Sequence, residues 1–152
     1  MESNIETVER LIAASPESIF SLLADPRRHR DFDGSGSVRE AKSHTDRLIL
    51  GSRFGMSMRA GLPYSMVNTV VEFQENRLIA WQTHAPGVLK KVIGGRIWRY
   101  ELEPVEGGTL VRESWDISRE SGLTKSAVRK MATVTRKNMT ATLARIEQVV
   151  TG

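Results

Sequence analysis

The stretch GRIWRYELEPVEGGTLVRESWDIS, residues 95–118, decides which fold we expect for this chain of 152 residues. Apolar and polar side chains alternate on both sides of Glu106-Gly107, a dipeptide typical of tight turns. A turn there pairs the two halves as an antiparallel hairpin. Four pairs then lie on its more apolar face: Leu102 with Val111, Tyr100 with Glu113, Trp98 with Trp115, and Arg96 with Ile117. Register and pattern therefore agree.

Working outward from this hairpin, turn residues divide the chain into further strands. The predicted strands cover residues 5–13, 38–46, 48–59, 64–74, 77–84, 95–104 and 109–118. The breaks between them contain Gly61 with Pro63, Glu75-Asn76 and Pro86-Gly87. Because the connections are short, we expect one antiparallel meander of about seven strands.

The last segment, residues 124–150, has the period of a helix. Its apolar positions recur at spacings of three and four: Val128, Met131, Thr135, Met139, Thr142, Ile146 and Val149. We expect one continuous helix with Thr124 as its N-cap and this face against the sheet. The face carries small and flexible side chains, so an apolar cavity of ligand size, about 300 Å³ or more, is expected between helix and sheet.

Two short helices are expected after the first strand. Ser15 is a suitable N-cap and Pro16 suits a first helical position. Asp25-Pro26 ends that helix, and residues 26–31 form a second helical turn. The whole chain, residues 1–152, is thus predicted to be a single α+β domain.

Composition narrows the function classes. The chain has no cysteine, and no apolar run reaches the length of a membrane span, so we expect a cytoplasmic protein without stable membrane insertion. The net charge is +4 and the pI about 9.8. However, only 6% of the residues are aromatic and no nucleic-acid motif is present, so a solvated basic surface is favoured over nucleic-acid binding.

The order of these elements resembles the START-like, or helix-grip, superfamily. Its bacterial polyketide cyclase/dehydrase and lipid-transport group is the most similar. The resemblance extends over nearly the whole chain and is carried by residues 14–20 (ASPESIF), 22–26 (LLADP), 98–104 (WRYELEP), 107–111 (GGTLV) and 113–116 (ESWD). It implies a curved sheet around a long C-terminal helix, with a cavity for a small hydrophobic or aromatic, lipid- or polyketide-like molecule. It implies no particular reaction, because members include cyclases, lipid carriers and hormone receptors.

Three polar residues of the hairpin are the candidate catalytic groups: Glu113, Tyr100 and Arg96. A carboxylate on an apolar concave face has a raised pKa unless it is paired, and it suits a general base, with the phenol as proton donor and the guanidinium orienting a carbonyl. The alternatives are that the set orients a ligand, or that it is structural, with the phenol or an arginine satisfying the carboxylate.

The candidate ligand-lining residues are mainly Trp and Met, since aromatic and flexible thioether side chains suit a planar ligand as well as an ordinary core. They are Met56, Met58, Trp81, Trp98, Tyr100, Glu113, Trp115, Met131, Thr135 and Met139. His29, His44 and His84 lack the spacing of metal ligands, so neither a metal nor a cofactor is predicted. Residues 85–95 (APGVLKKVIGG) form an apolar loop, interpreted as a lid, a longer hairpin or a contact surface.

Three functions remain open from the sequence. The first is binding of a small hydrophobic or aromatic molecule in the cavity. The second is a polyketide cyclase or dehydratase reaction that uses Glu113, Tyr100 and Arg96. The third is a protein- or nucleic-acid-binding adaptor with a filled core.

Overall fold

The hairpin of residues 95–118 forms in the predicted register. Strand β6 (Gly94–Val105) pairs with β7 (Gly108–Asp116), and Tyr100 lies opposite Glu113. The connection uses Gly107 with a φ of 90°, a conformation that glycine adopts without steric cost. The alternation of side chains therefore sufficed to predict which residues face each other.

All seven strands belong to one antiparallel sheet, in the order β1-β7-β6-β5-β4-β3-β2. The other strands are β1 (Ile5–Ile12), β2 (Val38–Ala41), β3 (Arg53–Ala60), β4 (Leu62–Gln74) and β5 (Leu78–His84). This computed structural model describes residues 4–34, 38–41, 47–60, 62–87, 89 and 93–152. The predicted α+β class with an antiparallel sheet of about seven strands is confirmed.

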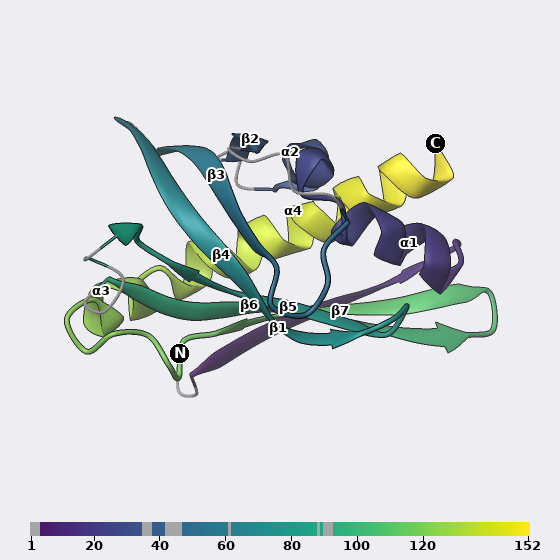
Figure 1. The fold of residues 1–152 in the computed structure, drawn as a ribbon. Coiled ribbons are helices and arrows are strands. Elements are labelled where there is room, and N and C mark those ends of the chain that lie inside the picture. The colour runs from purple at the N-terminus through teal and green to yellow at the C-terminus, as the bar shows by residue number, and fades with distance from the viewer. Residues whose placement is uncertain (1–3, 35–37, 42–46, 61, 88, 90–92) are drawn as a thin grey trace.

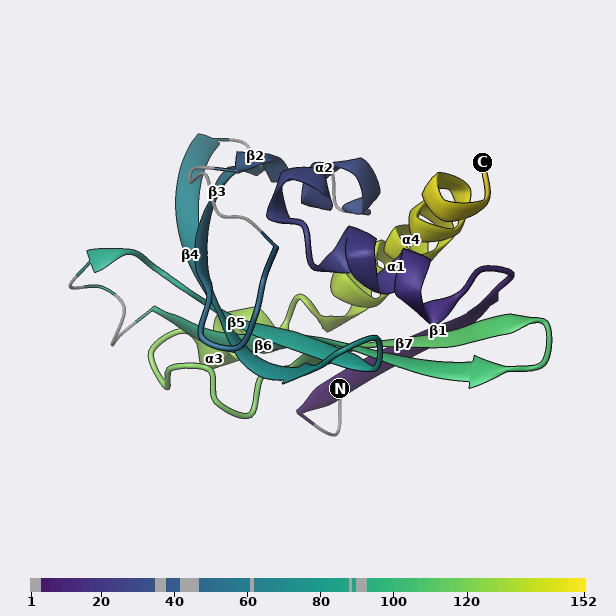
Figure 2. The same cartoon turned by 45° about the vertical axis from the view of Figure 1, so that its right-hand side comes forward.

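The helical elements are α1 (Pro16–Leu23), the 3-10 turn η1 (Pro26–Arg28), α2 (His29–Phe32), α3 (Lys125–Arg129) and α4 (Ala132–Thr151). Figures 1 and 2 show that α1, α2 and the long α4 lie on one side of the sheet, which curves beneath them, and that α3 lies near one end of the sheet. Ser15 caps α1 by accepting the backbone N–H of Ser18, and Asp25 caps η1 by accepting that of Arg27. These side-chain bonds satisfy N–H groups that have no partner within the helix, which explains why both helices begin where they do.

The core lies between α4 and the inner face of the sheet. Met139, Leu143 and Ile146 of α4 are buried there with Val111 and Trp115 of β7. Helix and sheet each have one apolar face, and burying both against each other produces the helix-grip arrangement. No helix of the described residues is long and apolar enough to cross a bilayer.

The C-terminal helix differs from the prediction because it is interrupted. The break falls at Lys130 and Met131, where the N–H of Met131 bonds three residues back to Val128, and no side chain caps α4. The expected cap Thr124 instead donates its hydroxyl to Glu120. As a result Met131 is 46% exposed and does not face the sheet as predicted.

The strand predicted to start at residue 48 begins only at Arg53. Leu48 is fully buried, and its N–H donates to the carbonyl of Ala24, which fixes the chain beside α1. A turn follows, in which the Ser52 hydroxyl accepts the N–H of Ile49 and Gly51 has a φ of 85°. This local side-chain bond competes with strand pairing and explains the late start.

Candidate functional site

Tyr100 and Glu113 form a buried polar pair on the inner face of the sheet. Both are almost fully buried, and the phenol donates a hydrogen bond of 2.9 Å to Glu113 Oε2. The other oxygen, Oε1, is buried and has no hydrogen-bond partner among the described residues. A buried carboxyl oxygen without a hydrogen-bond partner carries a desolvation cost.

The carboxyl of Glu113 is held mainly in its neutral form. Burial raises its pKa to about 8, and the negative charge of Asp33 adds to this, whereas the bond from Tyr100 acts in the opposite direction. Burial, followed by the neighbouring Glu113, also raises the pKa of Tyr100 well above its ordinary value. With Oε2 accepting from Tyr100, a neutral Glu113 carries its proton on Oε1, so this atom is a donor.

Trp115 supplies a second donor on the same face. It lies two residues after Glu113 on β7, so the two Cα atoms are about 7 Å apart. Its indole Nε1 is buried and has no acceptor within the described part of the chain. Trp98 lies opposite on β6, half-buried, with its ring centroid 6.3 Å from that of Trp115. The inner face therefore combines two unsatisfied donors with broad aromatic surfaces.

His29 is an interior residue that the sequence analysis did not assign to the site. Its ring stacks on Trp81 with centroids 4.8 Å apart, and its Nε2 lies 2.8 Å from the carbonyl oxygen of Leu23. Burial lowers its pKa to about 4. Trp81 in turn lies 5.5 Å from Tyr100, so an aromatic wall leads from α2 to the polar pair. Residues 26–31 are mostly polar, and the sequence predicted for them only a second helical turn after the helix that ends at Asp25-Pro26.

The segment after α2 is held against α4. The N–H of Gly34 donates to the hydroxyl of Thr142, and a Cβ on Gly34 would come within 2.1 Å of the carbonyl oxygen of Asn138. This close approach holds the adjoining Asp33 where its charge acts on both Glu113 and Tyr100. The sequence around Gly34 contains no pattern that indicates a contact with a helix.

The other predicted site residues differ in their burial. Thr135 and Met139 are buried on α4, on its core face. Arg96 is half-buried, and its backbone N–H donates to Glu120, while Glu113 takes Tyr100 as its partner. Met131 is exposed, and the side chains of Met56 and Met58, like His44, lie outside the described residues.

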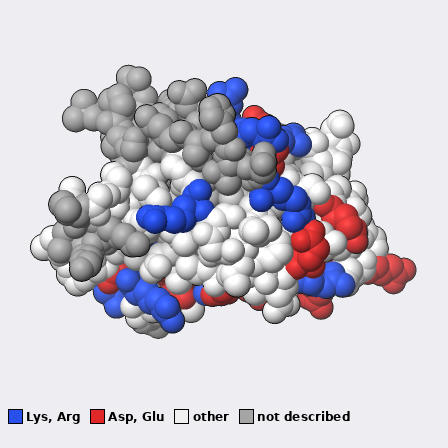
Figure 3. Space-filling model, viewed as in Figure 1, with Lys and Arg blue, Asp and Glu red and all other residues white. Residues whose placement is uncertain are grey.

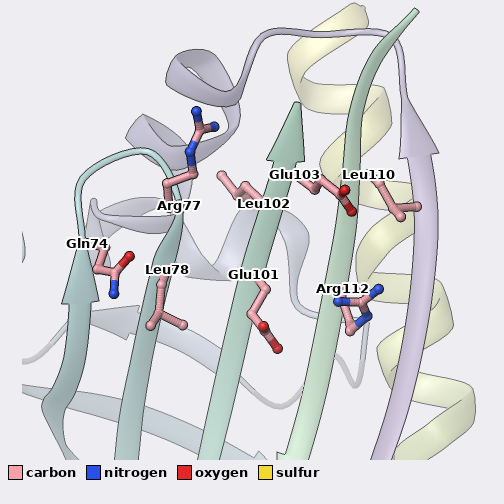
Figure 4. Close-up of a pocket in the computed structure, with 8 residues that line it drawn as sticks. All are labelled: Gln74, Arg77, Leu78, Glu101, Leu102, Glu103, Leu110 and Arg112. Carbon is pink, nitrogen blue, oxygen red and sulfur yellow. The ribbon is translucent and has the colours of Figure 1, made fainter. Parts of the chain in front are cut away.

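A separate hollow of about 320 Å³ lies on the outer face of the sheet, away from α4 (Figure 4). It is lined by Gln74, Arg77, Leu78, Glu101, Leu102, Glu103, Leu110 and Arg112. Four of these residues are charged, and Arg112 forms an ion pair with Glu9. Its polarity distinguishes it from the aromatic inner face, where the candidate site residues lie.

Comparison with protein families gives one match over nearly the whole chain. Residues 6–151 match the family described as polyketide cyclase / dehydrase and lipid transport. An uncharacterized protein of Mycobacterium tuberculosis, Rv0088, is 36% identical over 107 residues. The matched region is 69% of this chain and 44% of that relative, so the match spans less than half of the relative's length.

Solved structures share the fold at low sequence identity. Protein NE0264 from Nitrosomonas europaea has a TM-score of 0.75 at 12% identity, covering 99% of this chain and 96% of its own. The di-domain ARO/CYC StfQ from the steffimycin biosynthetic pathway has a TM-score of 0.72 at 12% identity, covering 97% of this chain and 50% of its own. Such identities establish a common fold and leave the site residues to be judged on their own geometry.

Proposed function

The chain belongs to the polyketide cyclase / dehydrase and lipid-transport family, and on that premise we propose that it binds a small, planar, largely apolar molecule bearing a carbonyl group. The binding place is the inner face of the sheet beneath α4. The observation that carries this proposal is the pair of buried atoms without partners, Glu113 Oε1 and Trp115 Nε1.

The chemistry of these atoms indicates the ligand class. Both are donors when Glu113 is neutral, and a ligand carbonyl oxygen accepts from either of them. The rings of Trp81, Trp98 and Trp115 offer planar apolar surface around them. A carbonyl-bearing aromatic molecule satisfies both requirements, whereas a purely aliphatic one leaves the donors without partners.

Calorimetric titration with 2-acetylnaphthalene, a planar aromatic ketone, tests this proposal. We expect saturable 1:1 binding that weakens about ten-fold in Trp115→Phe, which keeps an aromatic ring and removes the N–H. 2-Ethylnaphthalene, which lacks the carbonyl, should bind the two proteins alike. The matched control is Glu101→Gln in the outer hollow, which should bind as the wild type does. Binding that depends on Glu101 and is insensitive to Trp115 would refute the proposed location.

A second candidate function is an acid-assisted cyclisation or dehydration, favoured by the pKa of Glu113 of about 8. At pH 7 such a group is about nine-tenths protonated, so it acts as a general acid, and only above pH 8 is it mostly a base. In an aldol cyclisation the enol carbon of the substrate would attack the carbonyl carbon, and the carbonyl π bond would open as its oxygen takes the proton of Glu113. The carboxylate so formed would then accept the proton that the enol hydroxyl releases. The structural neighbour StfQ is described as ARO/CYC, which agrees with this class of reaction.

Turnover separates the two functions. If the protein is an enzyme, incubation with a linear poly-β-ketone should yield a cyclised product. The rate should fall at least 100-fold in Glu113→Gln, and this variant should bind 2-acetylnaphthalene as the wild type does. If the wild-type protein binds the poly-β-ketone and the compound is recovered unchanged, the binding function stands and the catalytic function is rejected.

A further inference from the structure

Exposed apolar side chains lie just before α3 and at the start of α4. Leu123 is 75% exposed, Met131 46% and Val134 50%. Val128 and Ala132, by contrast, are buried against the core. The interruption at Lys130 and Met131 thus leaves two adjacent apolar stripes, one covered by the sheet and one facing water, here called the Leu123–Val134 face.

The helical segment that carries this face has charged residues of one sign. From residue 121 to residue 146 the sequence contains no Asp or Glu and six basic residues: Lys125, Arg129, Lys130, Arg136, Lys137 and Arg145. Two of them reach toward β1, since Arg129 donates to Asn4 and Arg136 pairs with Glu6. Lys137 is exposed and stands three residues after Val134 on α4, which makes it a neighbour of Val134 on the helix surface. Lys130 is also exposed and precedes Met131 at the break between α3 and α4.

A second segment adds to the same end of the molecule. The carbonyl of Gly94 accepts the N–H of Ser121, so the start of β6 lies beside the segment leading into α3. Leu89, whose carbonyl accepts the N–H of Ile93, is 49% exposed. The acidic residues Glu103 and Glu106 lie at the opposite end, around the β6–β7 turn, where Figure 3 shows acidic side chains on the right. The β6–β7 turn and α3 lie at opposite ends of the molecule in Figure 1.

We propose that the Leu123–Val134 face docks on the surface of an anionic lipid bilayer. Apolar side chains that protrude beside lysines fit a headgroup boundary, where the former enter the acyl region and the latter meet anionic headgroups. A nucleic acid would leave the three aliphatic side chains in contact with a polar backbone, and the face presents no aromatic ring on which a base stacks. The proposal is independent of which molecule occupies the interior.

Flotation with vesicles tests the docking. Purified protein is mixed with vesicles of phosphatidylglycerol and phosphatidylcholine (1:1), or of phosphatidylcholine alone, in 0.1 M NaCl. We expect the wild type to float with the anionic vesicles at least ten times more than with the neutral ones, and to be released at 0.5 M NaCl, where charges are screened over about 4–5 Å. The double variant Met131→Asp/Val134→Asp should lose this binding at least ten-fold.

Two controls keep the result interpretable. Leu50→Asp changes an apolar side chain of similar exposure, 62%, at a distant turn and should bind vesicles as the wild type does. Circular dichroism and the melting temperature should match between wild type and the double variant, since both changed residues are half exposed. Failure of the wild type to float with anionic vesicles, equal flotation of the double variant, or binding to duplex DNA in place of vesicles at the same salt would overturn the proposal.

Discussion

The phenol of Tyr100 donates to Glu113 across a hairpin whose register follows from the sequence, and this bond leaves the second carboxyl oxygen buried without a partner. The position of the pair could therefore be predicted from the sequence, whereas the missing hydrogen-bond partner of Glu113 Oε1 is visible only in the structure. The desolvation cost of that oxygen is the reason why we propose that the pair contacts a ligand.

Glu113 should make the stability of the protein fall as the pH rises. Its pKa is about 8 in the folded chain against 4.5 unfolded, so between these values the folded state holds a proton that the unfolded state has lost. The contribution is fully present below pH 4.5 and is lost as the pH rises to 8, at a cost of about 3–5 kcal/mol. The difference in unfolding free energy between wild type and Glu113→Gln, measured in urea at several pH values, should show this slope. A flat difference would contradict the neutral buried carboxyl.

His29 should give the opposite slope at lower pH. Its folded pKa is about 4, below the unfolded value of 6.5, so the unfolded state alone gains a proton in this interval. Stability is therefore present above pH 6.5 and lost as the pH falls to 4, by about 3 kcal/mol. His29→Phe keeps an aromatic ring against Trp81 and should remove this acid dependence in the same urea measurements. If the unfolding free energy of the variant fell between pH 6.5 and pH 4 as much as that of the wild type, His29 would not be buried as described.

The two methionines of the C-terminal segment should respond in contrasting ways to a new charge. Met139→Asp places a carboxylate at a position that is 1% exposed and should cost several kcal/mol. Met131→Asp, at a half-exposed position, is the matched control and should change the unfolding free energy by less than about 0.5 kcal/mol. If both variants were equally destabilised, Met131 would be buried, and the helix would not be interrupted between α3 and α4 as described.

Gly34 should tolerate no side chain. A Cβ there would come within 2.1 Å of the carbonyl oxygen of Asn138 and 2.6 Å of the backbone nitrogen of Thr142, so α4 or the segment after α2 must shift. We expect Gly34→Ala to destabilise by about 1–3 kcal/mol. Gly122→Ala is the control, because nothing lies within 4 Å of its Cβ position. Thermal denaturation of both variants compares them, and equal melting temperatures would place α2 away from α4.

The elements that the sequence predicted well are those whose signal is local. The turn at Glu106-Gly107 and the alternation around Tyr100 determine the hairpin register, and Ser15-Pro16 determines the start of α1. The family match of residues 6–151 supports the same fold.

The features that sequence reasoning missed depend on tertiary contacts. His29 is polar in a polar segment, and only the rings of Trp81, Phe32 and Phe54 around it explain its burial. The close approach of Gly34 to Thr142 joins residues 108 positions apart, which no local pattern reveals. The exposure of Met131 follows from a helix break that the heptad-like spacing cannot show.

The most direct test of the proposed binding place is the indole N–H resonance of Trp115, whose donor has no partner among the described residues. The chain has three tryptophans, so Trp115→Phe assigns the signal in a ¹H–¹⁵N spectrum by its disappearance. On titration with 2-acetylnaphthalene, we expect a saturable shift of this resonance, with a midpoint equal to the calorimetric dissociation constant, and a smaller shift with 2-ethylnaphthalene. If the Trp115 resonance stays fixed while the ketone saturates the protein, the ligand does not bind beside Trp115.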